Sequence, residues 1–390
     1  MEHNFTRRPQ AASGVLLASL LLPGLALLAP SGAVAENAPE KSTIAIKYGS
    51  YNDWQPGWDR IKVSAPMIYV QAPIAGDWSI EGSWVGDSVS GATPRWYTAR
   101  SGATQHMNDY RKAGDVRVTR YLPRAAISAT AAYSDEHDYT SRALGLDARW
   151  SSDDNNRTWT VGLGHSSDTI DNTSNGVSTA IDQHKRTTEF MAGVTQVLTP
   201  TDIAQLNLTR SIGRGYYNDP YKSFDRRPDR RNAWIALARW NHHVERFGAS
   251  VRGSYRYYSD TFGVKSHTFG VDWVQPAGKW TFTPGVRYYT QSAARFYVDP
   301  SYTPQGTIDL SPAMALYGQN QPVSTDQRLA AFGAVTLSIK VGYAITPDTV
   351  VDFKYDAYRQ SAGKHLGSGG SPGLDPFSAR FLQVGLTHRF

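Results

Sequence analysis

Residues 382–390 read LQVGLTHRF, and this stretch decides the fold class. Every second residue from Leu382 to Leu386 is apolar, and Phe390 falls on the same parity, whereas the residues between them are polar or glycine. This is the period of a β-strand with one apolar and one polar face. His388 falls on the apolar parity and is one departure from the pattern.

The same alternation recurs along most of the chain. Apolar and polar side chains occupy opposite parities in residues 78–84, 144–150, 249–257, 335–341 and 351–356. Each segment spans about ten residues, the length of a tilted strand that crosses a bilayer. Charged residues are 19% of the chain, below the roughly 25% typical of soluble domains. Cysteine is absent, which excludes disulfide scaffolds, thiolate metal sites and cysteine nucleophiles.

Connections between these segments alternate between short and long. Short turns are predicted at Ala72–Asp77, Leu122–Arg124, Ser151–Arg157, Leu198–Asp202, Asn241–Arg246, Gln275–Lys279 and Thr346–Thr349. Longer polar connections are predicted at Asp53–Arg60, Ala92–Asn108, Asp135–Arg142, Asp171–Arg186, Arg214–Arg231, Asp260–Ser266, Val298–Thr325 and Ala362–Phe377. Strict alternation of the two kinds indicates about 16 antiparallel strands.

The competing fold is a soluble β-sandwich or propeller. A sandwich also alternates, but its polar face is normally richer in Lys and Glu than these segments are. Tryptophans such as Trp78, Trp150 and Trp280 stand at the ends of the apolar faces, several of them beside short turns, as in an interfacial girdle. Closure follows, because an open sheet edge in lipid leaves backbone groups unpaired. The prediction is an all-β, closed, antiparallel transmembrane β-barrel with short periplasmic turns and long extracellular loops.

Both chain ends carry targeting features. Residues 1–35 combine Arg7 and Arg8, an apolar stretch and the small-residue site Ala33-Val34-Ala35, which predicts a cleaved signal peptide. Residues 36–41 are then a short periplasmic segment and residues 42–390 the barrel, in the outer membrane of a Gram-negative cell. An alternating last strand ending in Phe390 resembles the signal that the barrel assembly machinery receives, although an ordinary edge strand has the same pattern.

Several polar stretches resemble an uncharacterised family of proteobacterial outer-membrane β-barrel proteins, carried as a domain of unknown function. The matching stretches are Tyr51–Pro66, Asp87–Arg95, Arg111–Tyr121, Arg149–Asn156 and Asp219–Lys222. The resemblance implies barrel architecture and outer-membrane residence. It implies no activity, and no functional residues carry over.

The polar parity collects charges of both signs, which are candidates to line a pore. These pore-lining candidates are Glu81, Asp87, Asp115, Arg117, Asp147, Arg149, Arg239, Arg252, Arg256, Asp272, Arg287, Asp352 and Lys354. Cross-strand pairing in a partly closed lumen explains the same pattern equally well.

Two long connections have alternative interpretations. The arginines of Arg214–Arg231 suit phosphate groups of lipopolysaccharide or anionic solutes, and its interspersed Asp residues suit a self-paired, folded-in loop. Val298–Thr325 is long enough to fold inward, with four prolines to stiffen it.

Residues that suggest catalysis or metal binding are isolated. His165-Ser166 has no third member for a hydrolase, and His242-His243 point to opposite faces of a strand. Asp153–Asn156 offers oxygen ligands without the spacing of a calcium loop. We therefore predict no enzyme activity, no cofactor, no metal and no nucleic-acid partner.

The function predicted from sequence is a porin-like channel for small polar or ionic solutes. The alternative is a non-transporting structural or partner-binding barrel whose lumen is plugged by loops. Expected partners are outer-membrane lipid and lipopolysaccharide, the barrel assembly machinery and an unidentified envelope protein.

Overall fold

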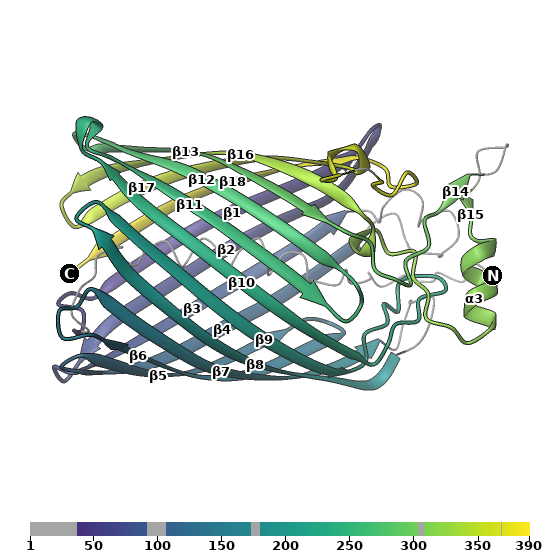
Figure 1. The fold of residues 1–390 in the computed structure, drawn as a ribbon, viewed down its shortest axis with the longest axis horizontal. Helices are drawn as coiled ribbons and strands as arrows, with labels where there is room; N and C mark the ends of the chain where they lie inside the picture. The colour runs from purple at the N-terminus through teal and green to yellow at the C-terminus, as the bar shows by residue number, and fades with distance from the viewer. Residues whose placement is uncertain (1–36, 92–106, 173–179, 303–307, 368) are drawn as a thin grey trace, which may run out of the picture.

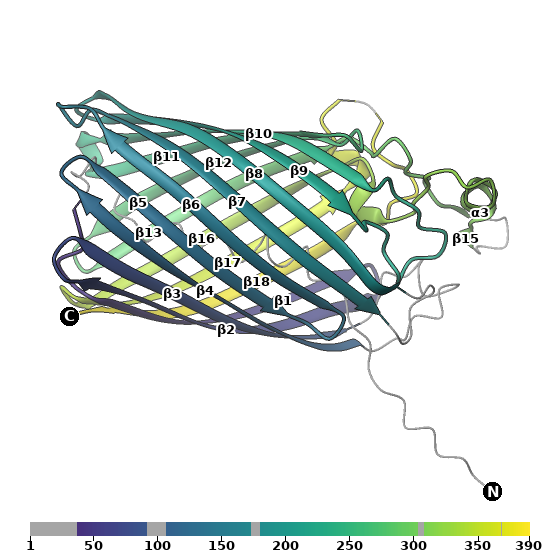
Figure 2. The same cartoon turned by 90° about the horizontal axis from the view of Figure 1, so that it is seen from below.

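A single ring of sixteen antiparallel strands closes on itself (Figure 1, Figure 2). The computed structural model describes residues 37–91, 107–172, 180–302, 308–367 and 369–390. Each strand pairs with its neighbours in the chain, and the ring closes where Thr43–Trp54 of the first strand pairs with Ser378–Arg389 of the last. The predicted fold class is therefore confirmed, and the predicted signal peptide lies outside the described residues.

The ring strands are 11 to 20 residues long, enough to cross a bilayer with a tilt. They are β1 (Thr43–Gln55), β2 (Trp58–Ile74), β3 (Trp78–Gly91), β4 (Met107–Leu122), β5 (Ala125–Asp135), β6 (Tyr139–Ser151), β7 (Arg157–Asn172), β8 (Ala180–Thr199), β9 (Asp202–Gly215), β10 (Arg230–Val244), β11 (Ala249–Asp260), β12 (Lys265–Ala277), β13 (Trp280–Gln291), β16 (Phe332–Thr346), β17 (Thr349–Ser361) and β18 (Phe377–Arg389). The remaining elements are η2 (Glu245–Phe247), β14 (Ser301–Tyr302), β15 (Ile308–Asp309), α3 (Ser311–Gly318), η3 (Gln327–Leu329) and η4 (Ala362–Lys364).

The two ends of the barrel differ. One end, called the turn end here, has short connections throughout and also holds the paired residues Ser42 and Phe390. In the β2–β3 turn, φ is 46° at Ala75 and 73° at Gly76, the two positive values of the hairpin turn that matches strand twist. The predicted short turns are confirmed.

The opposite end, called the loop end here, mixes long and short connections. Strands β1 and β2 are joined by Pro56 and Gly57 alone, and the predicted loops at Asp135–Arg142 and Asp260–Ser266 shrink to residues 136–138 and 261–264. These three predictions of longer connections were wrong, because polar residues at the strand ends stay in the hydrogen-bonded ladder. Gln55, for example, pairs with Trp58 directly at the β1–β2 hairpin.

The outer face of the ring is apolar. Leu144 and Leu337 are 69% and 60% exposed, and Val271, Phe353 and Val384 stand on the same face of their strands. A continuous exposed surface of this kind is not stable in water, and it matches the lipid-facing band of a membrane barrel. Within the described residues, no helix is both long and apolar enough to cross a membrane.

Candidate functional site

The strand register places every pore-lining candidate on the inner face. Directly paired residues share a face of the sheet, and Glu81 pairs with Arg117, Arg252 with Asp272, and Asp352 with the inward Gly385. The lipid-facing residues occupy the other parity throughout. All of these residues thus stand on the inner face, and whether they line a pore stays a prediction.

Part of the inner charge is paired within the barrel wall, along one strand or between nearby strands. Arg117 donates to Asp147 at 2.7 Å, and Arg111 lies 2.8 Å from Asp87. Lys340 and Lys354 lie 3.5 Å and 2.8 Å from Asp352 and Asp356. These pairs agree with the structural interpretation of the inner charges.

Four inner arginines form no ion pair with a described residue, although Arg252 lies opposite Asp272 in the strand register. Arg239, Arg252, Arg256 and Arg287, called the arginine arc here, occupy β10, β11 and β13, and β12 lies between the last two strands. Among the described residues, none of them forms an ion pair within 4.0 Å. Arg239 and the nearby inner Ser254 are exposed, so this part of the inner wall is accessible to water.

Two inner carboxylates face the arginine arc across the ring. Glu81 accepts from the hydroxyl of Tyr69 at 3.2 Å, and Asp115 accepts from Ser83. Their strands β3 and β4 lie eight places from β11 and β12 in the ring of sixteen, which is diametrically opposite. These acidic and basic residues lie between four and eight positions from the turn end of their strands, and none of them stands at the loop-end tip.

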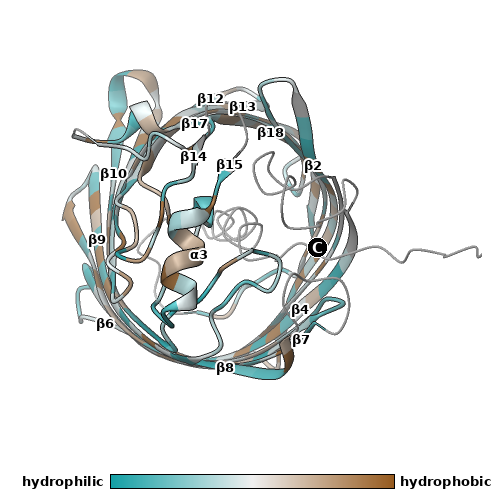
Figure 3. Ribbon diagram, turned by 90° about the vertical axis from the view of Figure 1, so that its right-hand side faces the viewer, coloured by the Kyte–Doolittle hydropathy of each residue, from teal (hydrophilic) through white to brown (hydrophobic). Residues whose placement is uncertain are grey.

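The loop end is crossed by two long connections. The β9–β10 loop (residues 216–229) and the β13–β16 loop (residues 292–331) form a two-way backbone bridge, in which Arg226 and Val323 exchange hydrogen bonds of 2.8 Å. Seen along the barrel axis, α3 lies over the interior of the ring (Figure 3). In the side view α3 stands beyond the loop end (Figure 1).

A buried ionic cluster joins these two loops and is called the mouth cluster here. Arg227 donates to Asp225 at 2.8 and 2.9 Å and to Asp326 at 2.8 Å. Arg328 donates to Asp326 at 2.7 Å and also bonds Asp219. Asp326 is fully buried. Within Arg214–Arg231, the bond of Arg227 to Asp225 agrees with the self-paired interpretation of this loop.

Burial and charge act in opposite directions on the mouth cluster. Burial alone would raise the pKa of Asp326, but Arg328 and Arg227 outweigh it and hold that pKa well below its usual range. Burial raises the pKa of Asp225 despite the opposing charge of Arg227. Burial also lowers the pKa of Lys222 to about 8.

Apolar contacts support the mouth cluster. Phe262, Val264, Ala294 and Leu329 form a small core under the loops, and Phe262 meets the ring of Tyr217 edge-on at 5.7 Å. The loops are thus packed against the barrel wall and against each other. Asp326 and Arg328 were not among the residues predicted from sequence, and they lie just beyond the predicted loop Val298–Thr325. Nothing in the local sequence around them indicates that they bind residues of the β9–β10 loop, about a hundred positions earlier.

The other sequence candidates do not assemble into a site. His165 lies on the outer face, bonded to Thr188 at 2.9 Å, while Ser166 is on the inner face. His242 bonds Asp202 at 2.9 Å on the outer face. Asp154 accepts from Asn156 within the β6–β7 turn. Within the described residues no group of three or more His, Asp or Glu side chains is arranged to hold a metal.

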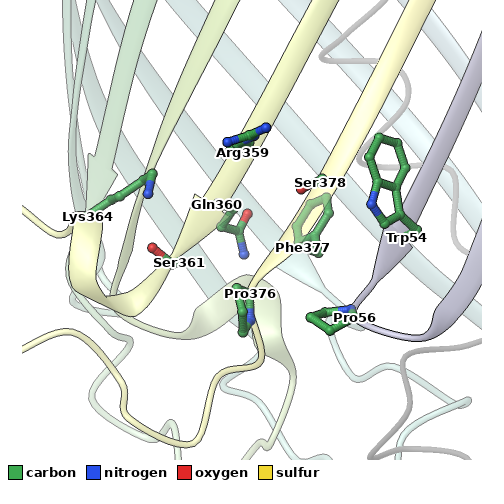
Figure 4. Close-up of a pocket in the computed structure, with 9 residues that line it drawn as sticks. All are labelled: Trp54, Pro56, Arg359, Gln360, Ser361, Lys364, Pro376, Phe377 and Ser378. Carbon is green, nitrogen blue, oxygen red and sulfur yellow. The ribbon is translucent and has the colours of Figure 1, made fainter.

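A pocket of about 190 Å³ lies on the outside of the barrel at the loop end. It is formed by β1, β17, β18 and the loop after η4, with Trp54, Arg359, Lys364 and Phe377 among its lining residues (Figure 4). Sequence reasoning did not predict it, because its residues come from distant parts of the chain.

An apolar outer face, a charged inner face and a closed ring of sixteen strands define a transmembrane β-barrel of the outer-membrane type. The chain belongs to the family described as protein of unknown function DUF3570, whose model matches residues 97–381. No curated protein matches the chain.

Several solved structures match the chain at very low identity. A bacterial polysaccharide outer membrane secretin is 8% identical, with a TM-score of 0.50 over 92% of this chain and 100% of that one. CdiB from Acinetobacter baumannii is 9% identical, with a TM-score of 0.49 over 88% and 60%. OccK9 (OpdG) from Pseudomonas aeruginosa is 10% identical, with a TM-score of 0.45 over 90% and 98%. This likeness concerns the fold alone.

Proposed function

We propose that this protein is an outer-membrane channel for small polar solutes, with a preference for anions. The observation that carries the proposal is the arginine arc, in which four arginines share β10–β13 with a single inner carboxylate among the candidates, Asp272, on the side of the ring opposite Glu81 and Asp115. A ring of sixteen strands encloses a width that admits water and small solutes. Charges of opposite sign on opposite walls orient a polar solute, and a wall of arginines concentrates anions.

The mouth cluster supports a second candidate, a barrel that does not transport. Two loops packed over the loop end and held by buried ion pairs narrow or close the entrance. In this alternative the outer loops bind an envelope protein and the lumen is structural. The exposed Arg239 and Ser254 on the inner wall favour the channel.

Single-channel recording in planar bilayers separates the two candidates. The channel proposal expects stepwise openings with anion selectivity. Arg252→Glu combined with Arg287→Glu should move the reversal potential toward cation selectivity, because two positive charges in the arc become negative. Arg142→Glu is the matched control: it reverses a charge on the outer face and should leave selectivity unchanged.

The outcome against the channel is equally definite. If correctly folded barrels give no openings, and the double variant Arg227→Ala, Arg328→Ala that loosens the mouth gives none either, the barrel does not conduct. The partner-binding candidate then replaces the channel. If the unmodified barrel and the Arg252→Glu, Arg287→Glu double variant both conduct with the same ion selectivity, the arginine arc does not determine that selectivity.

Export and orientation belong to the same proposal. Removal of residues 1–35 should leave a mature chain starting at Glu36, with the turn end in the periplasm and the loop end outside. Intact-mass measurement of protein from isolated outer membranes tests the cleavage. A mass that retains residues 1–35 contradicts it.

A further inference from the structure

The outer face of the barrel is basic at the loop end. Outer-parity lysines and arginines recur in the loop-end halves of strands around much of the ring, just beyond the apolar band. They are Lys62, Lys112, Arg142, Arg186, Arg210, Arg214, Arg230, Lys265, Arg359 and Arg380. Outer-parity carboxylates at this end, such as Asp135, are fewer and stand near the strand ends, as Arg230 and Lys265 also do. Basic side chains therefore outnumber acidic ones at this level of the outer face, and they are called the basic ring here.

The turn end has no such ring. Among the described strand residues, its outer parity carries only Arg120 and Arg157 as arginine or lysine. Each is stacked on a girdle tryptophan: Arg120 lies 5.4 Å from the ring centre of Trp78, and Arg157 lies 5.7 Å from that of Trp159. The two interfacial levels of the barrel thus differ strongly in charge, although both carry aromatic residues.

The basic ring borders the outside pocket near the seam where the barrel closes. Arg359 on β17 and Lys364 of η4 line this pocket together with Trp54 (Figure 4). Arg380 lies 4.8 Å from the ring centre of Trp54. No carboxylate lines the pocket, and none of these three cations forms an ion pair with a described residue.

We propose that this outer site, formed by Arg359, Lys364, Arg380 and Trp54, binds the phosphate groups of a phosphorylated membrane lipid. Guanidinium groups take phosphate in bidentate geometry, and an aromatic wall beside them suits the level where headgroup meets acyl chain. The residues lie on the parity of Leu382 and Val384, which face lipid, so the occupant approaches from the bilayer. The rest of the basic ring extends the same attraction around the barrel.

The site carries a consequence for orientation. A basic ring at one end and not at the other favours the insertion in which the loop end meets the leaflet richer in phosphorylated lipid. This agrees with the loop end facing outward. The inference rests on membrane residence and is independent of conduction, so a barrel that conducts nothing still tests it.

Native mass spectrometry of the full-length mature barrel in detergent measures the binding. The probes are lipid A, which carries phosphate on its sugars, and the same lipid after enzymatic removal of its phosphates. Arg359→Ala with Arg380→Ala should weaken lipid A binding about tenfold or more. Arg120→Ala with Arg157→Ala removes the same charge at the turn end and should leave binding unchanged. Arg359→Lys with Arg380→Lys keeps the charge and should retain most of the binding.

Three results overturn the proposal. Equal binding of lipid A with and without phosphate removes the role of the phosphates. Equal weakening by the turn-end control shows that charge alone matters and that the site has no special role. If inorganic phosphate at the same concentration as lipid A displaces lipid A from the barrel, the site binds a free anion and not a lipid. Heat-modifiable gel migration confirms that each variant is folded, and the lysine pair keeps the test valid if the alanine pair fails to fold.

Discussion

Single residues decide how firmly the loop end is closed. Asp326 accepts from Arg227 of the other loop and from Arg328 of its own, and its side chain is 1% exposed. Removing one partner of a buried ion pair leaves the others uncompensated, which costs about 3 kcal/mol in typical cases. Arg328 is partly exposed, so solvent offsets some of this cost.

Asp326→Asn should therefore release the two loops locally while the barrel stays intact. Exchange of the amides of Arg226 and Val323, which bridge the loops, should accelerate strongly in hydrogen-exchange measurements. Asp348→Asn is the control, because it breaks an exposed turn-end pair with Lys41 and should change protection little. Unchanged exchange at Arg226 and Val323 would show that the backbone bridge and the apolar core suffice to close the mouth.

The mouth cluster also predicts a response to acid. The pKa of Asp326 in the folded protein lies below its unfolded value of about 3.9, so its contribution is fully present above about pH 4 and is lost as pH falls through the folded pKa. Asp225 has the opposite effect on stability as pH falls, because its pKa in the folded protein is raised and its protonation favours the folded state. Pepsin cleavage within residues 216–229 should stay slow at pH 4 and increase toward pH 2. Rapid cleavage already at pH 4 contradicts this account.

At the residue scale the sequence predicted faces and not partners. Period-two alternation placed Arg252, Asp272 and Lys354 on the inner face because each strand has two faces only. Which carboxylate meets which arginine depends on register and loop folding. Arg227 and Asp326 are 99 residues apart, and no local pattern connects them.

At the scale of elements, the loop after β17 is positioned by a close backbone approach. A Cβ atom on Gly333 of β16 would lie 1.7 Å from the carbonyl oxygen of Lys364, far inside contact distance. The same carbonyl accepts from the hydroxyl of Tyr288 at 2.6 Å. Gly333 thus holds η4 against the outside of the barrel.

Gly333→Ala should displace η4 and the Lys364 side of the outside pocket, because the backbone of residues 364–365 must move. Trypsin should then cleave after Lys364 faster than in the unmodified protein. Gly363→Ala is the matched control, since a Cβ there meets nothing within 4 Å. Equal cleavage in both variants would mean that η4 is not held by this contact.

Elements were predicted unevenly for a physical reason. The strands could be predicted from the sequence because their lipid-facing side must be apolar at every second residue. The hairpin at Pro56-Gly57 was predicted as a loop, since polar residues at the strand tips carry no such constraint. The short helix α3 was not predicted at all. Val298–Thr325 was judged long enough to fold inward, and α3, which belongs to it, stands beyond the loop end (Figure 1).

At the scale of the whole molecule, the central claim is a membrane barrel with lipid outside and water inside. Closure of β1 on β18 removes both sheet edges, which a bilayer requires. The charged walls on opposite sides of the lumen then acquire a function only if water reaches them. The fold followed from sequence, and the openness of the lumen did not, because it depends on the packing of loops at the mouth.

Cysteine labelling tests this claim most directly, because the natural chain contains no cysteine. Ser254→Cys stands on the inner face, and Val271→Cys and Leu337→Cys stand on the outer face. In the barrel reconstituted into lipid vesicles, a water-soluble maleimide should label Ser254→Cys and leave the other two unreacted, and a lipid-soluble maleimide should reverse the pattern. Equal labelling of all three by the water-soluble reagent, or none at Ser254→Cys, would contradict a water-filled barrel in the membrane.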